Sequence, residues 1–443
     1  MRTKEGDNCY HPVYFSLFFY SLGNWWRPWQ LFITKDPLAS KLNFSRLWNQ
    51  RLTYEQRKDR ICGKEWQANY TNLHKDILQS RRPRRFIVFS CTVESYKCAG
   101  YGNRLGGIAS LLFLSILTQR ALLIEWDQEM PLDTYLVPKG IEWNYSTENI
   151  KDLDTRIHFL GKQNHFNTRR NDVLNQWEMK TDFVSWLLQT NIQAYFDRPV
   201  EKVVSNWYFA DFLLENPFLG QNVDELGIRR ERSRYSLIGC AFDFLFQKSR
   251  ELETRLDAAR RSLGLASQAP KLGLQIRMGD ISLHRGLLKN NHIDFKRFMN
   301  CARVFGQSLA RRKADTVREP VKWFLATDDT AVKRYALKNY PLNAVTLNIT
   351  PQHINSLTKT TNSEKIEGMF GVIMDHFLLS ECDFLILSKS TFGKTAAALF
   401  FHSEGTSIYE DVCGEQLRKG MTPNLRTIHQ IDGYFWKHRN SSN

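Results

Sequence analysis

The sequence predicts an α/β protein whose parallel strands form two separate sheets. Short, continuously apolar runs such as residues 86–90 and 384–388 are typical of strands that are buried on both faces of a parallel sheet. Amphipathic stretches of helical length separate such runs, once around residue 110 and repeatedly from residue 271 onward. Because the alternation occurs twice, we expect two Rossmann-like domains that face a central cleft.

The length and composition fit a folded protein of two or three domains. Hydrophobic residues make up 42% of the 443, which is enough for buried cores and excludes wholesale disorder. The net charge of +15 attracts anionic partners without choosing among them, and a basic excess spread over an ordinary surface also explains it. The basic runs at 81–85 and 229–234 lack interleaved aromatic residues, and no nucleic-acid-binding signature is present, so we expect no nucleic-acid partner.

Residues 1–84 show no clear period and end in a basic run, so we expect a linker or stem. Residues 13–22 are apolar, but a helix that spans a bilayer needs about 20 such residues. This run is a signal segment, a truncated signal-anchor or a strand of the fold, and membrane anchoring through residues 13–33 stays open. The expected organisation is an N-terminal segment followed by two Rossmann-like domains, at 1–84, 85–245 and 246–443.

The eight cysteines are scattered, and none lies in a pattern that is typical of zinc sites. We therefore expect no metal ion, and the disulfide pairing stays open. Five Asn-x-Ser/Thr sequons are acceptors for N-glycans only if the chain enters the secretory pathway. They are centred on Asn43, Asn69, Asn144, Asn348 and Asn440.

The first alternation consists of a strand, a glycine-bearing turn, a helix and a second strand. In this order they are expected at 86–90, 100–107, 108–119 and 121–125. From about 147 to 245 the period is mixed, and only helical stretches near 172–190 and 236–250 are predicted.

The second alternation is cleaner. Its strands are expected at 272–277, 321–327, 344–349, 384–388 and 407–411. Its helices are expected at 293–312, 330–338 and 364–380, with a further helix from Thr391. The third of these places Ile366, Met369, Phe370, Ile373 and Phe377 on one apolar face.

Residues at the carboxyl ends of parallel strands are the candidate site, because ligands of open α/β sheets bind there. Arg277 ends the strand at 272–277, where a planar guanidinium can bind a diphosphate through two hydrogen bonds. A pair with Asp280 that holds the turn is the alternative. Asp328 and Asp329 follow the next strand, and we expect one to bind a ribose or guanine and the other to cap a helix. A metal site at this pair would lack a third acidic ligand.

Residues 388–394 lead from a strand into an apolar helix. Hydroxyl groups, free backbone N–H groups and two lysines at such a helix N-terminus can form a phosphate cradle. An ordinary capping box without a ligand is the alternative, and the order of a Walker A loop is absent. In the first domain, Asn103 and Arg104 stand where a dinucleotide fingerprint needs its third glycine, so they are candidates for reaching a phosphate across the cleft instead.

Four segments together resemble the fucosyltransferases that use GDP-fucose, and the plant-type branch most of all. They are GYGNRLGGIASLLFLSILTQRALLIEW at 100–126, GLQIRMGD at 273–280, FLATDD at 324–329 and LSECDFLILSKSTFGKTAAALF at 379–400. The resemblance implies a GT-B architecture and inversion at the anomeric carbon. It also implies GDP-fucose as donor, a glycan or glycoprotein as acceptor, and neither a cofactor nor an obligatory metal ion.

The resemblance further implies roles for single residues of the second domain. Arg277 matches the family arginine that binds the β-phosphate and stabilises the leaving diphosphate as its charge develops. Ser390, Thr391 and Phe392 match residues that hold the diphosphate. Asp328 matches a position that contacts guanine in core-type relatives.

Other positions agree with the family only in part. Asn103, with its neighbours Gly102 and Arg104, matches a segment that reaches the donor from the other domain. Gln275 stands where core and O-fucosyl enzymes have a His, and its amide can still hydrogen-bond a base or ribose. Met278 stands where some members have a second Arg, so one positive contact with the donor is missing.

The resemblance leaves the catalytic base, the linkage and the oligomeric state open. Glu125, Asp127 and Asp280 are the nearby carboxylates, and the acceptor hydroxyl loses its proton to one of them or late, to the departing phosphate. The family and the sequons together imply residence in the secretory pathway, in the Golgi. The alternative function is a non-catalytic GT-B scaffold that binds a nucleotide-sugar, a glycan or a protein partner.

Overall fold

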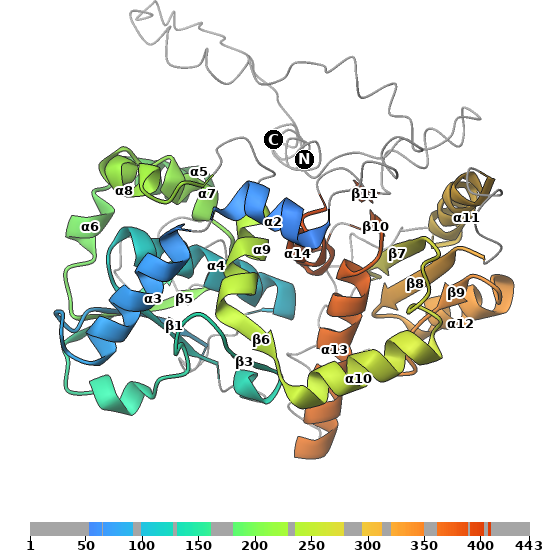
Figure 1. Ribbon diagram of the computed structural model, residues 1–443, viewed down its shortest axis with the longest axis horizontal. Coiled ribbons are helices and arrows are strands. Elements are labelled where there is room, and N and C mark those ends of the chain that lie inside the picture. The colour runs from blue at the N-terminus through green and yellow to red at the C-terminus, as the bar shows by residue number, and fades with distance from the viewer. Residues whose placement is uncertain are drawn as a thin grey trace, which may run out of the picture. The chain divides into compact units, whose positions relative to one another are not determined.

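Two parallel sheets with surrounding helices make up the part of the chain that the computed structural model describes (Figure 1). The described residues are 53–63, 65–91, 99–126, 131–160, 180–228, 235–278, 295–311, 320–349, 361–388, 390–402 and 406–408. All of them lie within one unit, Arg51–Asn443. The predicted α/β class is confirmed, whereas the domain boundaries at residues 84 and 245 stay a prediction.

The first sheet has four parallel strands in the order β2-β1-β5-β4. They are β1 (Phe86–Ser90), β2 (Ala121–Glu125), β4 (Thr155–Leu160) and β5 (Val200–Ser205). The apolar run of β1 lies between β2 and β5 and is buried throughout, as its composition predicts. The predicted strands at 86–90 and 121–125 are therefore confirmed to the residue.

The helix between these strands is longer than predicted. Helix α4 (Tyr101–Leu117) begins where the sequence predicts a turn, with Gly100 as its N-cap. The glycines act through their small size: a Cβ on Gly107 would lie 2.6 Å from the carbonyl oxygen of Ser205, and one on Gly106 would lie 3.2 Å from Tyr208. They let α4 approach the end of β5 closely, so the interpretation of these glycines as a turn is wrong.

Two helices occupy the end of the segment that was expected to be a linker or stem. Helix α2 (Tyr54–Cys62) contributes Cys62 to the buried core, and helix α3 (Glu65–Leu78) contributes Trp66, Tyr70 and Ile77. A disulfide joins Cys62 to Cys240 of α9 (Ser236–Leu245). For residues 53–78, the linker interpretation is therefore wrong.

Helix α3 protects the outer edge of the first sheet. The hydroxyl of Tyr70 accepts from the backbone N–H of Leu122 on edge strand β2 at 2.9 Å and donates to the carbonyl of Arg120 at 3.0 Å. The Nε2 atom of His74 lies 3.0 Å from the carbonyl oxygen of Leu122, so it carries the proton of this bond. Burial lowers the pKa of His74 to about 4, which keeps its ring neutral. Side chains thus take the place of a further strand.

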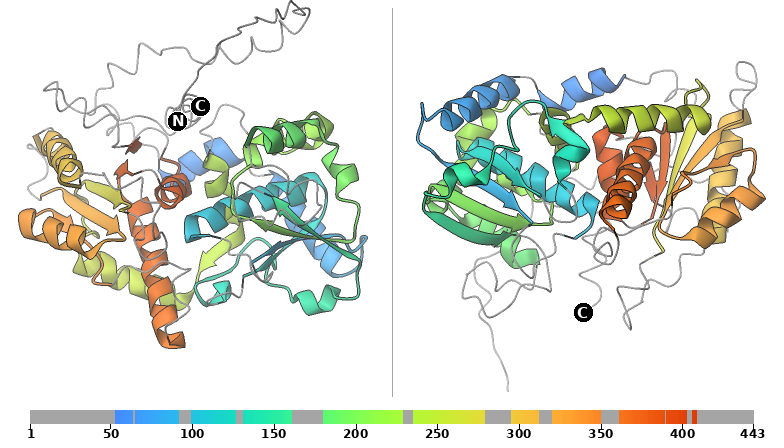
Figure 2. Two further views of the ribbon diagram at one scale, coloured as in Figure 1. Left: turned by 180° about the vertical axis from the view of Figure 1, so that it is seen from behind. Right: turned by 90° about the horizontal axis from the view of Figure 1, so that it is seen from below.

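The second sheet has five parallel strands in the order β11-β10-β7-β8-β9. They are β7 (Lys271–Ile276), β8 (Lys322–Thr327), β9 (Ala344–Val345), β10 (Phe384–Leu387) and β11 (Thr406–Ile408). Its helices are α10 (Arg250–Ser262), α11 (Phe295–Arg311), α12 (Thr330–Asn339), α13 (Asn362–Ser380) and α14 (Thr391–Leu399). Figure 2 shows α11 and α12 on one side of this sheet and α13 on the other.

The second alternation is confirmed with small shifts at the element ends. Strand β9 is shorter than predicted because the carbonyl groups of Leu347 and Ile349 accept hydrogen bonds from the Nζ of Lys333 at 3.1 and 2.8 Å. These carbonyls are therefore not part of a strand ladder. The last predicted strand begins within β11, and its residues 409–411 lie outside the described part.

Short elements connect β2 to β4, β4 to β5 and β5 to β7 along the chain. The strands β3 (Leu136–Pro138) and β6 (Phe246–Lys248) pair in antiparallel fashion. The helices are α5 (Lys180–Gln189), α6 (Ile192–Tyr195), α7 (Ala210–Leu214), α8 (Gly220–Asp224) and α9, with 3₁₀ turns at Leu132–Thr134, Thr147–Ile150 and Pro217–Leu219. The helical stretch predicted near 236–250 is confirmed over residues 236–245 of α9 and is wrong beyond them, because β6 follows and Ser249 caps the separate helix α10. The prediction near 172–190 holds from residue 180, and its earlier part lies outside the described residues.

Helix α9 packs against both α4 and α14. A Cβ on Gly239 would lie 2.4 Å from the carbonyl oxygen of Ala398, so glycine is required for this close approach to α14.

In the described part of the chain, no helix combines the length and the apolar character that crossing a membrane requires. The apolar run at 13–22 lies outside it.

We expect the Tyr70→Phe substitution to lower the free energy of unfolding by about 2 kcal/mol, because the buried N–H of Leu122 and carbonyl of Arg120 lose their partner. Urea unfolding monitored by circular dichroism measures this change. Tyr145→Phe is the control, since no hydrogen bond involves that hydroxyl in the described part. Equal stability of the two variants would contradict the role of Tyr70 at the edge of β2.

Candidate active site

Arg277 lies directly after β7, the central strand of the second sheet. Its Nη1 is 2.8 Å from Oδ2 of Asp328, which follows the neighbouring strand β8, and its side chain is one-third exposed. Asp280, the partner that the sequence suggested as an alternative, lies outside the described residues. The ion pair holds the guanidinium at the carboxyl ends of the strands while part of it still reaches solvent.

Asp328 uses both carboxylate oxygens within the protein. While Oδ2 pairs with Arg277, Oδ1 accepts from the backbone N–H of Met278 at 2.8 Å. Asp329 caps α12, since its Oδ1 accepts from the N–H groups of Ala331 and Val332 at 2.6 and 3.0 Å. The predicted capping role is therefore confirmed and belongs to Asp329. Asp328 positions Arg277, and its predicted contact with guanine stays a prediction.

Gln275 and Ser388 fix the backbone beneath Arg277. Gln275 is buried, and its Oε1 accepts from the hydroxyl of Ser388 at 3.0 Å. The same hydroxyl oxygen accepts from the backbone N–H of Arg277 at 2.9 Å. The side-chain carbonyl oxygen of Gln275 therefore has a hydrogen-bond partner within the protein. The contact with a base or ribose that the sequence suggested stays a prediction.

Helix α14 begins beside this group. Ser390 is its N-cap, and its hydroxyl accepts from the N–H of Phe392 at 3.2 Å. Ser390, Thr391 and Phe392 are all partly exposed, so their backbone groups can meet a ligand. Helix N-termini favour anions, because their N–H groups and dipole present partial positive charge. Lys389 lies outside the described residues.

The first turn of α4 touches the first turn of α14. A Cβ on Gly102 would lie 2.8 Å from the backbone nitrogen of Phe392, so only glycine fits here. Asn103, the next residue, is partly exposed. Arg104 is buried, with its guanidinium 4.7 Å from the ring centre of Trp126 and its Nε donating to the carbonyl of Ala99. The predicted residues Gly102 and Phe392 thus lie together, whereas Arg104 faces an aromatic ring.

His376 on α13 lies behind the contact between α4 and α14. Its Nε2 is 2.8 Å from the hydroxyl oxygen of Thr395, and its ring packs edge-on against Tyr101 and Phe392 at 5.1 and 4.9 Å. Burial lowers the pKa of His376 to about 3, so the ring is neutral at physiological pH. It supports the two helix starts without adding charge. The sequence analysis did not single it out.

Asp375, next to His376, is a second residue that the sequence analysis missed. Its Oδ1 is enclosed and has no hydrogen-bond partner in the described part, although the residue as a whole is partly exposed. Burial raises the pKa of this carboxyl to about 7, and the positive charge of Lys333 opposes the shift. A Cβ on Gly371, one turn earlier, would lie 2.7 Å from the Ile349 side chain. This face of α13 therefore packs near the segment that follows β9. An Asp-His pair within an apolar helix is the signal that could have revealed both residues.

Glu125 is held by two side chains of the first sheet and by one side chain of the 3₁₀ turn at Thr147–Ile150. Lys202 pairs with its Oε2 at 2.7 Å, Ser90 donates to the same oxygen at 2.6 Å, and Thr147 donates to Oε1 at 3.4 Å. Both oxygens of this carboxylate are therefore engaged within the protein. Asp127, another candidate base, lies outside the described residues. Within the described ranges, no group of three or more acidic, His or Cys side chains could hold a metal ion.

Comparison with known proteins connects this geometry to a family. Residues 228–393 match the family model described as alpha-(1,6)-fucosyltransferase N- and catalytic domains. The match includes Arg277, Asp328, Asp375 and the start of α14. No curated protein matches the sequence.

Solved structures give a likeness of fold. A mutant of Arabidopsis thaliana FUT1 in complex with GDP superimposes with a TM-score of 0.51 at 15% identity, covering 77% of this chain and 76% of that one. NodZ from Bradyrhizobium gives a TM-score of 0.40 at 16% identity over 71% of this chain and 92% of that one. Residues 228–393, which bring Arg277 to the start of α14, are therefore similar to the catalytic domain of the fucosyltransferases, a family of glycosyltransferases.

Proposed function

We propose that the protein transfers fucose from GDP-fucose to a hydroxyl group of a glycan or glycoprotein, with inversion at the anomeric carbon. The observation that carries this proposal is the placement of Arg277, held by Asp328 and Ser388 beside the N-terminus of α14. A diphosphate is the donor group that such a site suits best. The similarity to a GDP-bound FUT1 supports a guanine nucleotide.

We propose that Arg277 stabilises the leaving group. When the bond between the sugar and the β-phosphate breaks, negative charge develops on the phosphate oxygens, and a fixed guanidinium stabilises that charge more than the ground state. The ion pair with Asp328 orients the guanidinium without burying it completely. Ser390, Thr391 and Phe392 add N–H and hydroxyl groups at the start of α14, and Asn103 adds a contact from α4.

We assign guanine recognition to Asp375 in preference to Asp328. Guanine presents two neighbouring N–H donors on one edge, and a carboxylate can accept from both. Both oxygens of Asp328 already have partners, whereas Oδ1 of Asp375 has none in the described part. Lys333 holds the carbonyls after β9 and adds a positive charge near Asp375.

The proposal includes a GT-B arrangement with a central cleft between the two sheets, and neither a metal ion nor a cofactor. The parallel order of both sheets and the contact of Gly102 with Phe392 support it. Because Lys202 and Ser90 hold Glu125, we do not assign it as the base. The departing phosphate is the proton acceptor that we propose for the acceptor hydroxyl.

We propose that the protein resides in the secretory pathway, in the Golgi. The Cys62–Cys240 disulfide, together with the disulfide-bonded Cys91 and Cys301, fits an oxidising compartment. The sequon residues Asn69, Asn144 and Asn348 are all exposed and therefore accessible to N-glycosylation. A mass decrease of the native protein after peptide-N-glycosidase treatment is the expected result, and an unchanged mass would argue against this location.

Substitution of Arg277 tests the donor role. We expect Arg277→Ala to lower kcat by about 100-fold or more, because removal of one such fixed donor costs on the order of 3 kcal/mol in the transition state. Arg277→Lys should recover part of the loss, since it keeps the charge and loses the fork. GDP release from GDP-fucose over a panel of glycan acceptors measures the rates.

Arg334→Ala on the exposed surface of α12 is the matched control and should retain full activity. If Arg277→Ala keeps its rate while the unchanged protein transfers fucose, the assigned role of Arg277 is wrong. If the unchanged protein is stabilised by UDP and not by GDP, the donor assignment itself is wrong.

A pH dependence tests Asp375. Its carboxyl, with a pKa near 7, is partly protonated in the free protein, whereas guanine binding requires the ionised form. GDP affinity should therefore rise with pH below about 7, by up to tenfold per pH unit, and level off above it. Calorimetric titration with GDP at several pH values measures this profile.

Asp375→Asn should flatten the profile and weaken GDP binding, while the exposed Asp152→Asn control should leave both unchanged. The same raised pKa means that the folded state binds more protons than the unfolded one between about pH 4 and 7. Stability without ligand should therefore fall as the pH rises through this range, and less so in Asp375→Asn. A flat GDP profile in the unchanged protein would contradict the assignment.

A further inference from the structure

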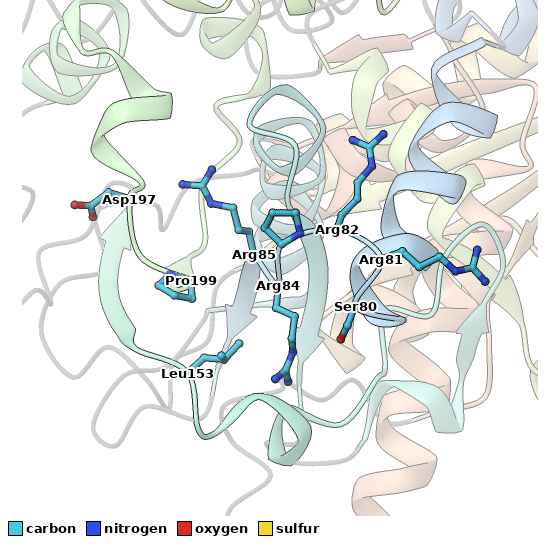
Figure 3. A pocket seen from close by; sticks show the side chains of 9 residues that line it. Ser80, Arg81, Arg82, Arg84, Arg85, Leu153, Asp197 and Pro199 are labelled. Carbon is cyan, nitrogen blue, oxygen red and sulfur yellow. The ribbon is translucent and has the colours of Figure 1, made fainter.

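The basic run at 81–85 lines a groove that the proposed donor site does not include (Figure 3). The run connects the end of α3 to the start of β1, and the groove has a volume of about 700 Å³. Arg81, Arg82, Arg84 and Arg85 line it, and Asp197 is the one acidic residue among its lining residues. It lies at the amino end of β1, whereas Arg277 lies at the carboxyl end of β7.

The arginines of this groove are poorly neutralised. Arg81 is 3.4 Å from Asp76, and Arg84 is 3.5 Å from Asp152, in exposed pairs of a kind that contributes little. The exposed guanidinium groups of Arg82 and Arg85 form no ion pair or hydrogen bond with any described residue. The groove therefore presents two cations whose charge is available to a ligand.

Further positive charge lies beneath the groove. Arg120 is buried, and its guanidinium donates to the carbonyl of Arg198 at 2.7 Å and to that of Phe196. Burial, followed by the charge of Arg85, lowers the pKa of Arg120 to about 10. The positive charge of Arg85 disfavours the charged form of Arg120. An anion bound at Arg85 therefore stabilises the charged forms of both side chains.

We propose that this groove binds an acidic polysaccharide through sulfate or carboxylate groups that repeat along its chain. In Figure 3 the guanidinium groups of Arg81, Arg82, Arg84 and Arg85 point in different directions. The run extends up to about 13 Å at 3.3 Å per residue step, so one small anion cannot contact all four. A chain of repeated anions can, and each planar guanidinium can hold a sulfate or carboxylate by two hydrogen bonds.

Other anionic partners fit the groove less well. A membrane surface gains affinity from apolar side chains that insert into it, and the large apolar residues that are exposed in the described part do not line the groove. They are Ile157, Phe218, Leu337 and Leu342. Single-stranded nucleic acids need aromatic side chains on which bases stack, and none lines the groove. A polysaccharide requires neither feature.

Fluorescence polarisation with a labelled heparin octasaccharide tests the proposal on the full-length protein. We expect saturable binding that weakens as salt concentration rises, because the polyanion releases counterions on binding. Arg82→Glu combined with Arg85→Glu should weaken it at least tenfold, since two contacts become repulsive. Arg250→Glu combined with Arg334→Glu makes the same change of charge at exposed positions outside the groove and should change affinity less than about twofold.

Competing ligands identify the source of the anion. Polygalacturonate tests carboxylates in place of sulfates, and a heparin disaccharide and inorganic sulfate test whether a single anion suffices. Neutral chitin oligosaccharides should not compete. An unchanged thermal unfolding midpoint shows that the groove variant is folded, so a loss of binding is not a loss of structure.

Four results would each overturn the proposal. The first is that neither the octasaccharide nor polygalacturonate binds. The second is an equal loss of affinity in the groove and control variants, which would make the binding an effect of net charge. The others are competition by inorganic sulfate as strong as by the octasaccharide, and binding to phosphatidylserine vesicles without binding to either polysaccharide.

Discussion

The hydrogen bonds between Gln275, Ser388 and Arg277 determine the geometry of the whole candidate site. The hydroxyl of Ser388 donates to Gln275 and accepts from the backbone of Arg277, so the ends of β7 and β10 are fixed to each other. Asp328 joins the end of β8 to the same point through Met278 and Arg277. Three strand ends therefore hold one guanidinium, and little rearrangement is needed when a ligand arrives.

On the side of the first sheet, helix α4 contributes to the site by close packing and not by charge. Glycine at 102 lets the first turns of α4 and α14 touch, so two helix N-termini meet in one place. His376 fills the space behind them as a neutral ring, because its burial opposes protonation. Two partial positive charges that adjoin in this way favour an anion between or beside them more than either would alone.

The sequence predicted the strands and the second set of helices well, because continuous apolar runs and helical periods report burial directly. Its predictions are wrong for features that depend on contacts with residues distant in the sequence. The glycines of α4 have the composition of a turn, and only the proximity of Ser205 and Tyr208 shows that they are contact points. Helices α2 and α3 are polar enough to suggest a linker, since their few buried side chains pack on elements that are distant in sequence. Arg277 followed from its place after a strand, whereas Asp375 required knowledge of what surrounds it.

The position of α2 and α3 has a practical consequence for shortened forms of the protein. The basic run at 81–85 suggests a natural starting point for a catalytic fragment, since the regular strand-helix alternation begins after it. A fragment that begins there would lose Tyr70 and His74, which would leave the β2 edge open to pairing with another molecule. It would also leave Cys240 as an unpaired thiol at the junction of α4, α9 and α14. Aggregation of such a fragment would then reflect the loss of its edge cover and would say nothing about its activity.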